Sequence, residues 1–330
     1  MSLRDRTNAA IGAETLPLLI FLCLVFLVFS LVTPLFLTGA NFGSMAFQMP
    51  VLGLLTLAML GPILSGGLNL AIIYQANISG LALAWVLIEF GGPEAGIGAF
   101  LLGSALAVLT GAASGALMGA VVAYFGAHPI LVSLAMMIFL RGLGEFLTRG
   151  SDISGFPDYM NVLGHGSFVS IPVPMIIFIL AAILWHIMLK RSRHGFSVYM
   201  IGSNIEAAEY SGLHTKRTLV TIYAISGMIC AIAGIVMAAR FNSVRVGHGE
   251  ALLLVTVLAC FLGGIDPFGG FGSVFPVAIA LIILQALSSG LNLIGANQHL
   301  STAVWGLFLI AVMVLRWVGM RWRNKQLGGT

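Results

Sequence analysis

Apolar residues in this chain are gathered into long blocks separated by short stretches rich in Gly, Pro and charged residues. About ten such blocks follow one another: Leu16–Leu37, Met45–Leu64, Leu68–Phe90, Gly96–Phe125, Pro129–Thr148, Ile171–Leu189, Thr218–Ala239, Ala251–Leu262, Gly272–Ile294 and Leu300–Val318. A helix of roughly 20 apolar residues crosses a bilayer core about 30 Å thick. The pattern therefore predicts an all-α polytopic membrane protein, with residues 1–330 forming one membrane domain of about ten helices in the lipid bilayer.

Composition supports the membrane assignment. Hydrophobic residues make up 59% of the chain and charged residues 8%, against about a quarter charged in soluble domains. Arg4 and Arg6 precede the first block, but no small-residue cleavage site follows it, so we expect it to stay as the first helix. Cys23, Cys230 and Cys260 all lie inside apolar blocks and predict neither a disulfide nor a metal site.

The basic residues predict the orientation of the chain. With ten helices, eleven of the fifteen Lys and Arg residues fall on one side, which is the cytoplasm by the positive-inside rule. Nine helices would remove this asymmetry. We therefore expect both termini (1–15 and 319–330) and the segment 190–217 to be cytoplasmic, and 149–170 to be a long, ordered and partly helical periplasmic loop. Membrane topology thus explains the excess of basic residues behind the net charge of +4, and this charge indicates no nucleic-acid partner.

Two glycine pairs predict breaks in helices. Residues 64–70 read LSGGLNL and residues 261–267 read FLGGIDP, a similarity that favours internal duplication over chance. The block Ala251–Leu262 is too short to span untilted, so we expect a broken or re-entrant element at 263–272 that faces the bundle interior. The candidate path or gate residues at these breaks are Gly66, Gly67, Asn69, Gly263, Gly264 and Asp266. Asp266 is also expected to cap an exposed helix end.

Neutral polar residues lie inside two apolar blocks. Asn69 and Asn77 are expected on one face of a helix, and Gln285 and Asn292 on one stripe of another. Such groups either form hydrogen bonds between helices or line a wet path for a hydroxyl-rich solute. Both interpretations stay open. Arg141 and Glu145, four residues apart near the outer end of a block, are expected to form a structural ion pair.

Motifs of catalysis are absent from the sequence. It contains no HExxH, no GxSxG and no GxxxxGK[ST] loop for ATP phosphates. We therefore predict no enzymatic activity and no cofactor. If ATP drives this protein, another chain binds it.

The cytoplasmic segment 190–217 carries a patterned motif. Gly195–Gly202 is expected to lead the chain out of the membrane, Asn204 to cap a short helix, and Gly212 to end it. The spacing Glu-Ala-Ala, three residues, Gly resembles the EAA loop of ABC importer permeases, a short helix that docks into a cleft of the ATPase subunit. A solvated surface helix is the alternative.

Several motifs in the same order resemble the ribose/xylose-type permeases of bacterial monosaccharide ABC importers, over about 41–318. They include the LSGG and LGG...GGFG segments, LGHGSFVSIPVP at 163–174, and the run from Arg193 through the AA and SG pairs to Ala233 and Gly234. The resemblance implies an inner-membrane importer subunit with a cytoplasmic ABC ATPase, a periplasmic solute-binding protein, and a second permease as homodimer or heterodimer partner. The implied ATPase-coupling residues are Gly202, Asn204, Glu206, Ala207, Ala208 and Gly212.

Two departures from that family concern the path. Leu68–Ile73 and Ile265–Phe268 differ from the usual family residues, so the solute is left open beyond a sugar or similar hydroxyl-rich compound. The rival functions are an ion-coupled secondary carrier and a membrane scaffold that recruits a cytoplasmic partner. No span centre contains a carboxylate, which argues against the carrier.

Overall fold

The computed structural model describes residues 3–169, 171–297, 300–301, 303–312 and 314, with side chains from residue 15 onward. The long helices are α1 (Leu3–Val32), α2 (Gly39–Leu64), α3 (Ile72–Glu89), α4 (Ile97–Phe125), α5 (Pro129–Thr148), α7 (Val173–Arg191), α10 (Thr215–Phe241) and α12 (Val274–Leu293). The short elements are η1 (Gly92–Glu94), β1 (Ile153–Ser154), α6 (Tyr159–His165), β2 (Ser167–Phe168), β3 (Ile171–Pro172), α8 (Arg193–Ser203), α9 (Ile205–Tyr210), β4 (Ser243–Val244) and α11 (Leu252–Leu262).

The helices confirm an all-α polytopic membrane protein. Among the described residues, eight helices have the length and apolar character needed to cross a bilayer. Two shorter apolar helices, Leu252–Leu262 and Ala303–Val312, occupy the eighth and tenth predicted blocks. The part of the tenth block beyond residue 314 lies outside the described residues, as does the tail 319–330.

Helix α10 lies at the centre of the packing, against α2, α3 and α4. Glycines allow the closest of these approaches. A Cβ atom at Gly115 of α4 would lie 2.2 Å from the Tyr223 carbonyl oxygen, and one at Gly111 would lie 2.3 Å from the Gly227 carbonyl oxygen. These small residues therefore serve close helix contacts, as in other membrane bundles.

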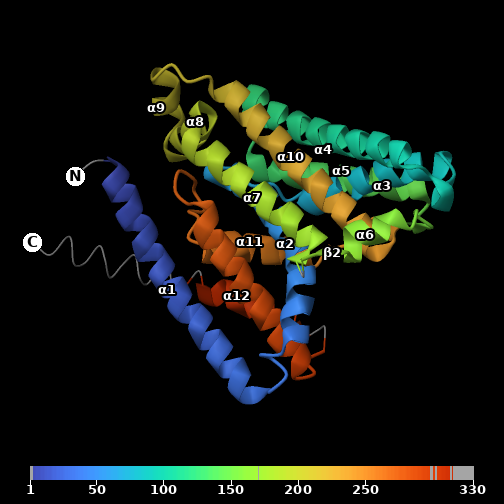
Figure 1. Ribbon diagram of the computed structural model, residues 1–330. Coiled ribbons are helices and arrows are strands. Elements are labelled where there is room, and N and C mark those ends of the chain that lie inside the picture. The colour runs from blue at the N-terminus through green and yellow to red at the C-terminus, as the bar shows by residue number, and fades with distance from the viewer. Residues whose placement is uncertain (1–2, 170, 298–299, 302, 313, 315–330) are drawn as a thin grey trace, which may run out of the picture.

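The two ends of the bundle differ. Figure 1 shows α8 and α9 together at one end, and α6 with β2 at the other. The described part of the predicted long loop, 149–169, lies at this second end and is ordered: it contains α6, and β1 pairs antiparallel with β4. The expectation of a partly helical loop is thus confirmed by these elements.

Helix α11 is short because the chain is irregular on both sides of it. The break at 263–272 was expected, but the turns at 245–251, between β4 and α11, were not. Val244 is buried against Gly80 of α3 and Val246 contacts Gly144 of α5, so this irregular stretch packs among helices. Non-helical backbone at such a place needs protein or water around it.

The two glycine pairs end their helices in the same way. Gly66 has φ +81° and its N–H donates to Ile63 O, while Gly264 has φ +85° and its N–H donates to Phe261 O. Only glycine adopts this left-handed conformation without strain. The structurally equivalent residues are therefore Gly66 and Gly264. The two sequence segments, aligned from their first residues, pair Gly66 with Gly263, one position away. Internal duplication stays a prediction.

Candidate functional site

Helix α9 has defined signals at both ends. Asn204 Oδ1 accepts a hydrogen bond from Ala207 N at 2.9 Å, the expected N-cap. At the other end Gly212 has φ +77°, its N–H donates to Glu209 O, and Leu213 N donates to Ala208 O. These bonds satisfy the last carbonyls of the helix. The short helix predicted from the sequence is therefore present with the predicted start and stop.

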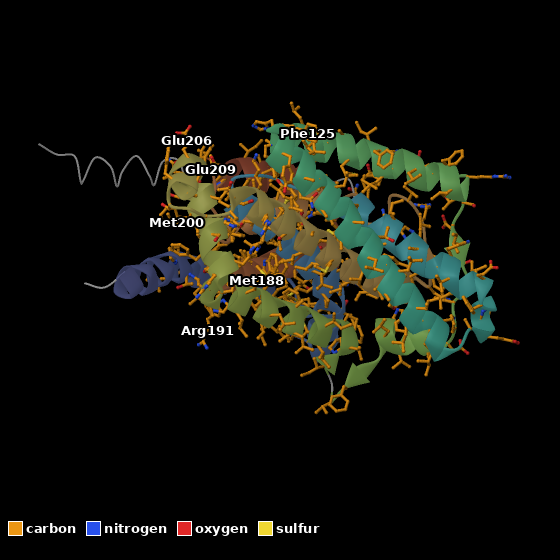
Figure 2. The ribbon with its side chains drawn as sticks, turned by 90° about the horizontal axis from the view of Figure 1, so that it is seen from above. Phe125, Met188, Arg191, Met200, Glu206 and Glu209 are labelled. Atoms are coloured by element: carbon orange, nitrogen blue, oxygen red, sulfur yellow. The ribbon has the colours of Figure 1, made fainter. Side chains whose placement is uncertain are left out.

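The two faces of α9 have different surroundings. Ala208 is fully buried and packs in a small apolar cluster with Ile201 and Leu219. On the other side Glu206 and Ala207 are exposed, and Tyr210 is 94% exposed. Figure 2 shows Glu206 at the α8–α9 end of the molecule, together with Glu209, Met200 and Arg191. The exposed face is free to meet another protein, whereas Ala208 anchors α9 to its own chain.

The segment before α9 is helical: α8 covers Gly195–Gly202, where the sequence predicted only the exit of the chain from the membrane. Helix α8 starts because Ser192 Oγ accepts from Gly195 N at 2.9 Å. Gly195 also permits a tight turn, since a Cβ there would lie 2.2 Å from Leu189 O. Tyr199 of α8 donates its hydroxyl to Gly272 O at 2.8 Å, and burial raises the pKa of Tyr199 to about 12.

Glycines join α8 to both predicted breaks. A Cβ at Gly202 would lie 2.0 Å from Leu64 O, and one at Gly269 would lie 2.6 Å from Gly66 N. Gly270 N donates to Leu64 O at 3.0 Å. We call the contact of Gly66, Gly202, Gly269 and Gly270 the glycine junction. Sequence reasoning treated its parts as separate sites, but the structure brings them together directly before α9.

Asn69 is fully buried and belongs to a turn, not to the expected helix, because α3 begins only at Ile72. Its Nδ2 donates to Gln75 Oε1 and to Ser226 Oγ, each at 2.9 Å, and its Oδ1 accepts from Ala71 N at 3.0 Å. Every polar atom of the Asn69 side chain therefore has a partner within the bundle. This arrangement favours the structural interpretation for this residue.

Three other predicted path residues, Asn77, Asp266 and Gly67, make contacts within the protein. Asn77 is buried. Its amide oxygen accepts a hydrogen bond from Gly247 N at 2.9 Å, and its amide nitrogen donates one to His248 O at 3.2 Å. Asp266 accepts from Phe268 N at 2.9 Å inside the loop, so it stabilises a turn and not a helix end as expected. Gly67 leaves room for the Tyr223 hydroxyl, which would lie 2.3 Å from a Cβ.

The two residues of the predicted polar stripe on α12 have different surroundings. Gln285 is buried and donates to Gln48 Oε1 of α2 at 3.3 Å, next to a cavity of about 200 Å³. Asn292 is exposed in the last turn of α12 and does not join it. The structure thus keeps Gln285 as a path candidate and separates Asn292 from it.

A charged cluster joins α5 to the irregular stretch before α11. Arg141 Nε lies 3.0 Å from Glu145 Oε1, which confirms the expected pair. Arg141 Nη1 also lies 3.8 Å from Glu250 Oε1, and Tyr74 donates to the same oxygen at 3.1 Å. The sequence did not indicate the contact of Tyr74 and Arg141 with Glu250, because nothing in the spacing links Tyr74 to a residue 176 positions away.

Within the described part of the chain, no group of three or more His, Cys, Asp or Glu side chains is placed to hold a metal ion. Cys230 and Cys260 are buried free thiols, and Cys23 is an exposed free thiol.

A bundle of apolar helices with a short capped helix packed at one end defines a polytopic membrane protein. The sequence matches the family described as "Branched-chain amino acid transport system / permease component" over residues 41–315, and the chain belongs to this family. It is 30% identical over 275 residues to "Autoinducer 2 import system permease protein LsrD" of Yersinia enterocolitica, covering 82% of this chain and 81% of the relative. The LsrD protein of Salmonella typhi gives the same identity and coverage. No solved structure matches.

The chain is therefore the membrane-spanning permease subunit of an ABC importer and not an enzyme. It is a multi-pass inner-membrane protein. A permease of this kind works with a separate ATPase subunit and a solute-binding protein. The ion-coupled carrier and the scaffold are set aside by this membership.

Proposed function

We propose that two permease chains, either two copies of this one or this one and a close relative, enclose a path for a sugar or similar hydroxyl-rich solute. The relatives are named for autoinducer 2 and the family for branched-chain amino acids, so the names point to different solutes. Neutral donors and acceptors inside the bundle, among them Gln48, Gln285 and Ser288, support the hydroxyl-rich class.

The observation that carries the proposed coupling is the two-sided burial of α9. Its inner face is fixed by Ala208, while Glu206, Ala207 and Tyr210 are exposed. An exposed aromatic residue beside charged residues is typical of a protein contact. We infer that this face docks the ATPase and that the α9 end, with both chain termini, is cytoplasmic. The basic residues of the segment 190–217 support this orientation.

The glycine junction offers a route for the ATPase movement into the bundle. Backbone of α8 contacts the end of α2 and the loop 263–272 with no side chain between them. Such close backbone contact leaves little freedom for one segment to shift alone. A displacement of α9 would therefore move the ends of α2 and α12 with it.

Substitutions on the two faces test the coupling separately. Ala208→Glu places a charge in the contact with Ile201 and Leu219 and is expected to undock α9 from its own chain. Gly212→Pro removes the N–H that donates to Glu209 O and so disrupts the end of the helix. Tyr210→Ala alters only the exposed face.

All three variants should insert in the membrane yet lose co-purification with the ATPase subunit and ATP-driven uptake. Phe168→Ala, an exposed aromatic residue at the opposite end, is the matched control for Tyr210→Ala and should retain both properties. Normal uptake and normal co-purification in Ala208→Glu, Gly212→Pro and Tyr210→Ala would refute the coupling assignment.

A further inference from the structure

A cavity of about 200 Å³ lies between α2, α10, α11 and α12. Its polar lining comes from Gln48 of α2, Arg240 of α10, and Gln285 and Ser288 of α12, with the backbone of Gly249 beside them. Trp305 adds an aromatic side chain. The remaining lining is aliphatic or aromatic, so the cavity combines a few polar groups with apolar walls, as small-molecule sites do.

The polar groups of this lining are incompletely used within the protein. The single hydrogen bond between Gln48 and Gln285 is 3.3 Å long, beyond the usual range for N–H to O. Gln48 Nε2 also donates to Ser44 Oγ at 2.8 Å. Each amide offers two donors and two acceptor positions, so part of this capacity is left on both side chains. Arg240 is half-buried, and no carboxylate of the described residues pairs with it.

The size of the cavity restricts its occupant. A cavity of about 150 Å³ holds benzene, a ring of six heavy atoms. Drug-sized ligands need about 300 Å³ or more. The volume of about 200 Å³ therefore suits one small ring with a few substituents.

The lining also restricts the chemistry of the occupant. Amide and hydroxyl groups both donate and accept, which matches hydroxyl groups on a solute. An amino acid would bring an ammonium group, and the lining contains no Asp or Glu to receive it. A single guanidinium with no anion beside it can donate to hydroxyl oxygens or ring oxygens.

We propose that this cavity is a solute site of the permease and that it takes a neutral polyhydroxylated ring of monosaccharide size. Gln48, Gln285, Ser288 and Arg240 form the hydrogen bonds, and Trp305 covers the apolar face of the ring. The proposal rests on the proposed function, because the solute reaches the cavity only if the chain forms the path.

Uptake by the assembled complex provides the first test. Gln285→Ala and Trp305→Ala are compared with Trp85→Ala, whose indole is 64% exposed on α3 outside the cavity. With labelled pentoses and hexoses, Gln285→Ala should lower uptake about fivefold to tenfold for lost hydrogen bonds of ordinary strength. Trp85→Ala should match the unmodified complex. Equal uptake by all three variants and the unmodified complex overturns the cavity proposal.

Chemical labelling provides a second test that does not depend on transport. Gln285→Cys, in a chain without Cys23, should react with a small maleimide more slowly when pentose at millimolar concentration is present. Protection by L-leucine or by ribose phosphate, but not by neutral sugars, overturns the solute class. Unchanged labelling with every probe overturns the site.

Failure of the proposed coupling and failure of the cavity proposal give different results. If the unmodified chain does not co-purify with its ATPase subunit, the proposed coupling fails, and sugar protection of Gln285→Cys still decides the cavity. If the complex assembles and transports but neither uptake nor labelling responds at Gln285 and Trp305, the cavity proposal alone fails.

Discussion

Replacing Gly202 by alanine should separate ATP hydrolysis from solute movement. The added Cβ would lie 2.0 Å from Leu64 O and 2.5 Å from Gly270 N. Both are backbone atoms, so no side-chain rotation relieves the contact. The segments must move apart, and the hydrogen bond from Gly270 N to Leu64 O is then lost.

The size of the effect follows from these contacts. Overpacking of a tight contact costs about 1–3 kcal/mol, and the lost hydrogen bond adds about 1 kcal/mol. The joined state of the glycine junction is therefore disfavoured by about 2–4 kcal/mol, a factor of roughly 30 to 1,000 in its population. Because α9 itself is not changed, the ATPase should still bind.

The assay is the number of solute molecules imported per ATP hydrolysed by the complex in proteoliposomes. Gly202→Ala should lower this ratio at least tenfold while the ATPase subunit still co-purifies. The matched control is Gly142→Ala on α5, where a Cβ meets no atom within 4 Å, and its ratio should be unchanged. A ratio in Gly202→Ala equal to that of the unmodified protein would refute transmission through the glycine junction.

Three further changes have expected outcomes. Asn204→Ala removes the cap of α9 and should cost about 1 kcal/mol in the stability of this helix, seen as faster proteolysis at the α9 end, whereas Asn204→Asp should behave as the unmodified chain. Gly115→Ala should lower thermal stability by about 1–3 kcal/mol because its Cβ meets Tyr223 O; Gly98→Ala on the same helix, with open space around it, is the control, and equal melting of the two would contradict the packing argument. Burial lowers the pKa of His194 in α8, so its folded form resists protonation. Stability near α8 should therefore fall as the pH drops below the unfolded-state pKa of about 6.5. The measurement is hydrogen exchange of α8 as a function of pH. The unmodified chain should show the loss of protection at low pH, and His194→Gln should not.

Much of the helical bundle could be predicted from the sequence, because apolar blocks of membrane length are a local signal. The two ends of α9 were also predictable, because their signals are local. Asn204 accepts from Ala207 N at the start of the helix, and Gly212 N donates to Glu209 O at its end. Helix α8 was missed for the opposite reason. The sequence predicted only an exit from the membrane at Gly195–Gly202, because the contacts of Gly195 with Leu189 and of Gly202 with Leu64 become visible only in the folded chain.

The candidate path was predicted less well. Asn69 was expected on a helix face, yet it closes a turn and binds Ser226, which is 157 residues away in the sequence. Glu250 reaches Arg141 and Tyr74 through an irregular stretch with no periodic pattern. Contacts of this kind depend on tertiary packing, so neither spacing nor residue type indicates them in a single sequence.

The proposed coupling depends most directly on the exposed face of α9 as the ATPase contact. The measurement is cross-linking of the assembled complex from Glu206→Cys on α9, compared with Glu94→Cys in η1, an exposed carboxylate position at the opposite end of the molecule. We expect a cross-link to the ATPase subunit from position 206, with a yield that changes when ATP binds, and none from position 94. A fully assembled, transporting complex that gives no cross-link from position 206, or an equal one from position 94, would contradict it.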